Sequence, residues 1–69
     1  MKNKIFRYDT TTRSVVSYDG GIEVARYPVL VEADRNGGSN VSVGDKSEFG
    51  VPYGGIEASA ERLARDSKR

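Results

Sequence analysis

The first half of the chain alternates between apolar and polar positions with the two-residue period of a β-strand. β-branched and aromatic residues dominate residues 4–33, and turn residues interrupt them at short intervals. A polar, glycine-rich stretch at 34–40 follows, and after it comes a shorter apolar stretch. The pattern predicts strands at about 4–9, 14–19, 22–33 and 41–45.

The turns between these segments predict how the strands pair. A three-residue loop, Asp19-Gly20-Gly21, places Val16 opposite Val24, whereas a two-residue loop would set Tyr18 against Glu23 and mix apolar with polar faces. Closing the preceding loop at Asp9 and Arg13 places Phe6 opposite Val16. The expected core face therefore consists of Phe6, Tyr8, Val16, Tyr18, Ile22 and Val24.

The apolar pattern changes phase after Val24. The apolar residues of 27–33 then alternate one position out of step with Ile22 and Val24, and Pro28 cannot donate a ladder hydrogen bond. The strand is therefore expected to bend, bulge or lie at an edge. Apolar residues outside the expected core face predict a homodimer in which the second sheet face is hidden: Val15, Ala25 and Leu30.

The C-terminal segment carries the one helical pattern in the chain. Ile56, Ala60, Leu63 and Ala64 fall on a narrow stripe, which predicts a helix at about 56–67 packed on one face of the sheet. Residues 46–55 are expected to be irregular, anchored by Phe49, Val51 and Tyr53. The predicted fold is a single α+β domain over 1–69, a four-stranded, mostly antiparallel meander with one C-terminal α-helix.

Composition removes several classes of chemistry. The 69 residues include no cysteine and no histidine, so disulfides are impossible and the usual zinc and haem ligands are missing. The commonest general base and the best nucleophile are missing as well, and we expect no enzyme activity, metal or cofactor. The stretch "GVPYGGIEA" at 50–58 resembles a phosphate-binding turn before a helix, but Glu57 would repel a phosphate there. We interpret it as a chain reversal.

Charge is unevenly distributed along the chain. Four bases against Asp9 give residues 1–13 a net +3, and four bases against Asp66 give residues 62–69 a net +3. Residues 14–61 hold eight acids against three bases, a net of −5. An acidic middle segment between basic ends carries information about binding partners and not about the fold.

Two binding hypotheses follow from this pattern. In the first, the acidic segment docks on a basic groove of a partner protein, and the candidate contacts are Glu23, Glu32, Asp34, Asp45, Glu48 and Tyr27. Glu32, Asp34, Asp45 and Glu48 are expected near one end of the sheet. In the alternative, the basic strand and helix bind nucleic acid through Lys4, Arg7, Arg62 and Arg65.

The segment "GGIEASAERLARDSKR" at 54–69 resembles the C-terminal helix of a small phage-encoded inhibitor of type I CRISPR surveillance complexes. The likeness rests on a Gly-x-Ile-Glu start, an alanine and a basic end, and covers about a quarter of the chain. The second helix of that inhibitor has no counterpart here. Resemblance to the anti-CRISPR kind implies a cofactor-free inhibitor of a nucleic-acid-handling complex. No signal peptide or membrane span is expected, which indicates a cytoplasmic protein, in the host cell if phage-encoded.

Overall fold

The protein is an antiparallel sheet with one α-helix after it, and the computed structural model describes residues 4–66. The strands follow one another as neighbours in the order β1-β2-β3-β4-β5. Their bounds are Lys4–Asp9, Ser14–Asp19, Ile22–Ala33, Ser39–Val43 and Lys46–Val51, followed by a 3-10 turn η1 at Tyr53–Gly55 and helix α1 at Ile56–Asp66. The predicted α+β class is confirmed, but the sheet has five strands and not four.

The fifth strand, β5, lies where the sequence predicted irregular chain. It pairs antiparallel with β4, setting Ser42 opposite Ser47 and Ser39 opposite Val51. The ladder shifts register between Ser39 and Val41, where the side-chain oxygen of Asn40 accepts a hydrogen bond from the backbone of Gly50. The predicted helix extends to residue 67, which lies outside the described residues.

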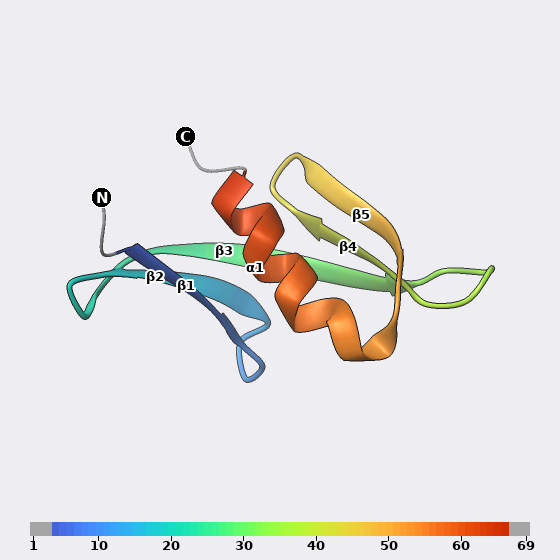
Figure 1. Ribbon diagram of the computed structural model, residues 1–69, viewed down its shortest axis with the longest axis horizontal. Helices are drawn as coiled ribbons and strands as arrows, with labels where there is room; N and C mark the ends of the chain where they lie inside the picture. The colour runs from blue at the N-terminus through green and yellow to red at the C-terminus, as the bar shows by residue number, and fades with distance from the viewer. Residues whose placement is uncertain (1–3, 67–69) are drawn as a thin grey trace.

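Strand β3 is shared by two three-stranded halves of the sheet. Its first part, up to Pro28, pairs with β2, and its second part, from Val29 to Ala33, pairs with β4. In Figure 1 the long strand runs across the molecule, with the β1–β2 hairpin on one side and the β4–β5 hairpin on the other. Pro28 occupies the change of partner, where its missing N–H leaves no ladder position empty.

The register between β2 and β3 differs from the prediction. Asp19 pairs with Ile22 around a two-residue turn, because Gly20 and Gly21 both adopt positive φ (62° and 86°), as a type I′ turn requires. Tyr18 therefore opposes Glu23, the pairing that the sequence argument rejected. The next pair is Ser17 with Ala25, so Val24 is an extra residue that forms a bulge. The predicted change of phase after Val24 is confirmed.

The β1–β2 register is also one residue away from the prediction. Asp9 pairs with Ser14 and not with Arg13, and Phe6 therefore opposes Ser17 and not Val16. A slip of one residue turns every side chain of a strand to the other face. Val15 consequently lies in the core, fully buried, and the expected core face was wrong for Val16, Tyr18, Ile22 and Val24.

Helix α1 covers one face of the sheet and closes the core. It packs on β1 and β2 on one side and on β4 and β5 on the other, crossing in front of β3 (Figure 1). The aromatic ring of Phe6 packs against Tyr27 at 6.0 Å between centroids, and the Arg65 guanidinium lies 5.9 Å from the centre of the Phe6 ring. The buried apolar core consists of Phe6, Val15, Val41, Val43, Val51, Ala60, Leu63 and Ala64.

Within residues 4–66 no helix lies on the opposite face of the sheet, which is called the open face below. Leu30 and Phe49 are exposed there, whereas Val16 is only 2% exposed although no element covers it. Of the three residues that suggested a homodimer, Val15 is in the helix-covered core, and Leu30 remains exposed on the open face. The homodimer stays a prediction.

Candidate functional site

The second half of β3 has one unpaired edge. The Val29 N–H donates to the Arg13 carbonyl (3.0 Å), on the side where β2 lies, and the Asp34 N–H donates to the Gly38 carbonyl (3.1 Å), on the side of β4. In an antiparallel ladder the N–H and C=O of one residue point the same way, and successive residues alternate. The backbone groups of Val31 and Ala33 must therefore point to the β2 side, where the described residues place no strand beyond Arg13.

Two hollows flank this edge on the helix-covered face. One, of about 360 Å³, is lined by Tyr8, Arg13, Val29, Leu30, Val31 and Ile56. The other, of about 410 Å³, is lined by Ala33, Gly38, Ser39 and Tyr53. Val31 and Ala33, which carry the outward-facing backbone groups, thus each border a hollow.

Two of the predicted acidic contacts lie beside this edge. Glu32 is exposed on the open face, opposite Asn40 of β4, and Asp34 follows the last residue of the strand. The Asp34 carboxylate accepts the Asn36 N–H (3.2 Å) and so shapes the turn. Among residues 4–66 no ion pair is recorded for either carboxylate. Both keep their negative charge available to a partner.

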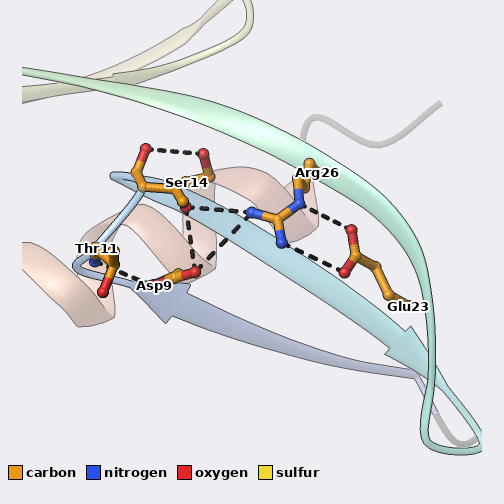
Figure 2. Close-up of polar contacts among 6 residues, drawn as sticks. Asp9, Thr11, Ser14, Glu23 and Arg26 are labelled. Atoms are coloured by element: carbon orange, nitrogen blue, oxygen red, sulfur yellow. Dashed lines mark hydrogen bonds and ion pairs between the residues drawn. The ribbon is translucent and has the colours of Figure 1, made fainter.

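Glu23 is instead neutralised within the protein. Its carboxylate accepts hydrogen bonds from Nε (2.8 Å) and Nη2 (3.4 Å) of Arg26. Figure 2 shows the Arg26 guanidinium between Glu23 and the β1–β2 turn, where Nη1 donates to the Thr12 hydroxyl (3.2 Å) and lies 3.9 Å from the Asp9 carboxylate. Because Arg26 is the cross-strand neighbour of Val16, this network also helps to bury Val16.

Glu48 points toward the helix and not toward solvent at the sheet end. Its Oε1 accepts hydrogen bonds from the Ser59 hydroxyl and from the Arg62 guanidinium. These two donors, with the charge of Arg62, lower the pKa of Glu48 below its ordinary value. Glu48 therefore ties β5 to α1, and its contacts are structural.

This contact predicts acid sensitivity. A carboxyl whose folded-state pKa is depressed stabilises the fold above its unfolded-state pKa, and that contribution disappears as pH falls through the folded-state value. Between neutral and acid pH, we expect the free energy of unfolding, measured with urea, to fall more for the wild type than for Glu48→Gln. Parallel pH profiles for the two proteins would contradict the assignment, and Glu57→Gln, which changes an exposed glutamate of α1, is the matched control.

The four acids predicted at one end of the sheet do not gather there. Asp45 lies in the β4–β5 turn, next to the pairing of Val29 with Val43, while Glu32 lies at the opposite end of the β3–β4 ladder. Glu48 opposes Val41 near the middle and faces the helix. That expectation was wrong because it assumed that 41–45 formed the strand, whereas the strand is Ser39–Val43.

Tyr27 is half-buried and packs against the core beside Phe6, so little of its side chain is accessible to a partner.

The residues predicted to contact nucleic acid are dispersed over the fold. Arg7 pairs with Val16 and so lies on the open face, whereas Arg62 and Arg65 belong to the helix and are engaged by Glu48 and Phe6. Lys4 shares the helix-covered side with Phe6, following strand alternation.

The turn before the helix serves as a chain reversal, in line with its sequence interpretation. The Gly55 N–H donates to the Pro52 carbonyl (2.8 Å), so it is occupied inside the protein. Within residues 4–66 no group of three or more Asp or Glu side chains is arranged to hold a metal ion. In the same part of the chain, no helix has the length and apolar character to cross a membrane.

The sequence suggested Glu32 and Asp34 as partner contacts, which stays a prediction, and it did not reveal the unpaired edge between them and Arg13. The signal was present in Pro28, which marks the change of partner along β3, and in the unusual length of a strand that runs from Ile22 to Ala33. A small α+β fold by itself does not imply a function. Comparison with protein-family models, with curated proteins and with solved structures finds no match to this chain.

Proposed function

We propose that the chain is a non-enzymatic protein-binding module, a small phage-type inhibitor that docks on a nucleic-acid-handling enzyme or CRISPR surveillance complex. The observation that carries the proposal is the state of the acidic residues. Glu23 and Glu48 are each held by an arginine of the same chain, whereas Glu32 and Asp34 are left without an ion pair among the described residues. A paired carboxylate attracts a partner weakly, and an unpaired one steers encounter with a basic surface.

The position of the two carboxylates adds to this argument. They lie where the sheet edge is open and where apolar hollows border Val31 and Ala33. Charged residues that surround an apolar contact area are typical of protein interfaces. The resemblance of the C-terminal helix to the anti-CRISPR kind supplies the class of target, and a basic nucleic-acid groove is the surface that an acidic patch fits.

The test is a double charge reversal, Glu32→Lys with Asp34→Lys. We expect capture of the partner from host lysate to be abolished, while circular dichroism stays near wild type and the melting temperature falls only slightly, because Glu32 is exposed and Asp34 loses a single hydrogen bond within the turn. The capture is carried out with and without nuclease. If a nucleic acid and no protein is captured, and nuclease removes it, the inhibitor proposal is wrong.

The matched control is Asp19→Lys with Asp66→Lys, which changes the net charge by the same amount. Asp19 pairs with Lys4, and α1 ends at Asp66 beyond the contact of Arg65 with Phe6, so both lie at the other end of β1 from the Arg13 turn. This control is expected to bind normally. Equal loss in both double variants would mean that only overall charge matters and that the surface at Glu32 and Asp34 is not the interface.

A further inference from the structure

Besides the free part of β3, the sheet has outer edges on β1 and β5, and a side chain of the helix guards the edge of β1. On β1, the outward-facing Tyr8 N–H donates to the Glu61 carboxylate of α1 (2.9 Å). A charged group held against an edge blocks the approach of another strand. Among residues 4–66 no side chain is recorded as bonding the outward backbone groups of Val31 or Ala33, so this edge offers its donors and acceptors to an added strand.

The length of the edge limits what can pair with it. Val29 already holds the Arg13 carbonyl, and beyond Ala33 the chain turns through the Asp34–Gly38 contact. An added strand can therefore use only the outward groups of Val31 and Ala33. A short extended segment of about four residues satisfies them, which is the β-augmentation mode of peptide recognition.

The side chains at the edge specify the residues of such a segment. On the helix-covered face, its side chains would meet the hollows beside Val31 and Ala33, where Tyr8, Ile56 and Tyr53 supply apolar walls. On the open face, the position directly opposite Glu32 meets an unpaired carboxylate. An opposite charge across a strand pair is favourable, and a like charge is unfavourable.

This charge pattern excludes a second copy of the chain as a well-matched occupant. A two-fold antiparallel pairing that uses both Val31 and Ala33 sets Glu32 against Glu32 of the second copy. If the two-fold axis passes through Val31, Ala33 of the second copy lies opposite Val29, whose N–H already donates to the Arg13 carbonyl. Moving the axis to Ala33 sets Glu32 against Asp34 of the second copy. Each symmetric register meets a like charge or an occupied position.

We infer that the edge from Leu30 to Ala33 binds an extended segment of the partner protein as an antiparallel sixth strand, with lysine or arginine opposite Glu32 and small apolar residues on either side. The inference rests on the proposed function and names the structure that the partner presents. Apolar residues flanking the base enter the hollows, and the base pairs with Glu32. Backbone pairing supplies affinity, and the alternating side chains supply specificity.

The experiment uses a synthetic peptide, acetyl-Thr-Val-Lys-Val-Thr-amide, and the full chain labelled with ¹⁵N. We expect the peptide to shift the amide signals of Val31 and Ala33 and to slow their hydrogen exchange at least tenfold at saturation. A peptide methylated on the two backbone nitrogens that would donate to Val31 and Ala33 is expected to lose the effect. A peptide with glutamate in place of lysine is expected to bind at least fivefold more weakly.

Glu32→Lys should reverse the preference, so that the glutamate peptide becomes the better ligand, while Asp19→Lys leaves the preference as in wild type. Equal binding of the two peptides, or shifts confined to Leu30 and Phe49 on the open face, would overturn the inference. Protection of Val31 and Ala33 that grows with protein concentration without peptide would also overturn it, in favour of a second copy.

The outcomes separate this inference from the proposed function. If peptides pair at the edge while the Glu32 and Asp34 double reversal leaves partner capture intact, the proposed function fails and the edge pairing stands. If capture requires the two carboxylates but the amides of Val31 and Ala33 stay unprotected in the captured complex, edge pairing fails and the proposed function stands.

Discussion

Val15→Asp is expected to leave the chain unfolded, whereas Val24→Asp is expected to leave it folded. Val15 is fully buried on the helix-covered face, and an aspartate there has no basic partner to compensate its charge. Burying an unpaired carboxylate costs several kcal/mol, comparable with the roughly 3–10 kcal/mol that stabilises a domain of this size. Val24 is 53% exposed at the bulge, where a substitution changes stability by about 0.5 kcal/mol or less.

Whether each variant is folded is measured by far-ultraviolet circular dichroism and by the dispersion of amide signals in an NMR spectrum. The pair distinguishes the observed register from the one that the sequence suggested, because that register puts Val24 in the core and Val15 outside it. A folded Val15→Asp beside an unfolded Val24→Asp would show that β2 faces the other way.

Gly38→Ala is expected to have the next largest effect. A Cβ atom at Gly38 would lie 2.9 Å from the Val51 carbonyl oxygen and 3.0 Å from the Gly50 carbonyl carbon, both backbone atoms that cannot rotate away. The residue also has φ +77°, which strains any side chain. We expect a loss of about 2–4 kcal/mol, which lowers the melting temperature by roughly 10–30 °C.

Two further glycines separate the causes of that loss. Gly37 has φ +102° with open space around its Cβ position, so Gly37→Ala measures backbone strain without the clash. Gly54 has neither feature, and Gly54→Ala is expected to be neutral or slightly stabilising. If Gly38→Ala and Gly37→Ala have the same melting temperature, the close approach of the β3–β4 turn to β5 does not contribute to the loss of stability.

The sequence located most elements because their patterns are local. The ranges of β1, β2 and β3 match the prediction, and α1 begins at Ile56 as its apolar stripe indicated. The phase change after Val24 was visible in the sequence because a bulge must shift the alternation. These features depend on residues close together in the chain.

The β2–β3 register and the fifth strand could not be predicted from such local patterns. Gly20-Gly21 is compatible with a two-residue or a three-residue loop, and pairing apolar residues favoured the wrong one, since Glu23 opposite Tyr18 is satisfied by Arg26. In β5 the glutamate on the helix-covered face is the half-exposed Glu48, which is held there by hydrogen bonds from Ser59 and Arg62. Both outcomes depend on contacts that no local pattern contains.

Within the candidate site, the sequence identified the carboxylates but not the backbone beside them. Glu32 and Asp34 were two of the five acidic residues that the charge pattern suggested as contacts. The free edge arises because β2 begins only at Ser14, opposite Pro28, while β3 continues to Ala33. This difference in strand length becomes visible only when the pairing of the strands is known. Pro28 indicated the position of the change but not which side would stay open.

The order of elements along the chain also determines when the core can close during synthesis. Every strand pairs with its neighbour in sequence, so each hairpin can form as soon as its second strand has been made. Helix α1 follows the five strands, yet it supplies Ala60, Leu63 and Ala64 to the core and the Glu61 carboxylate that guards β1. A nascent chain that has only its five strands therefore exposes Phe6, Val15 and Val41 together with an unguarded edge on each side of the sheet. Aggregation is therefore a hazard for the nascent chain until α1 has been made and can pack on the sheet.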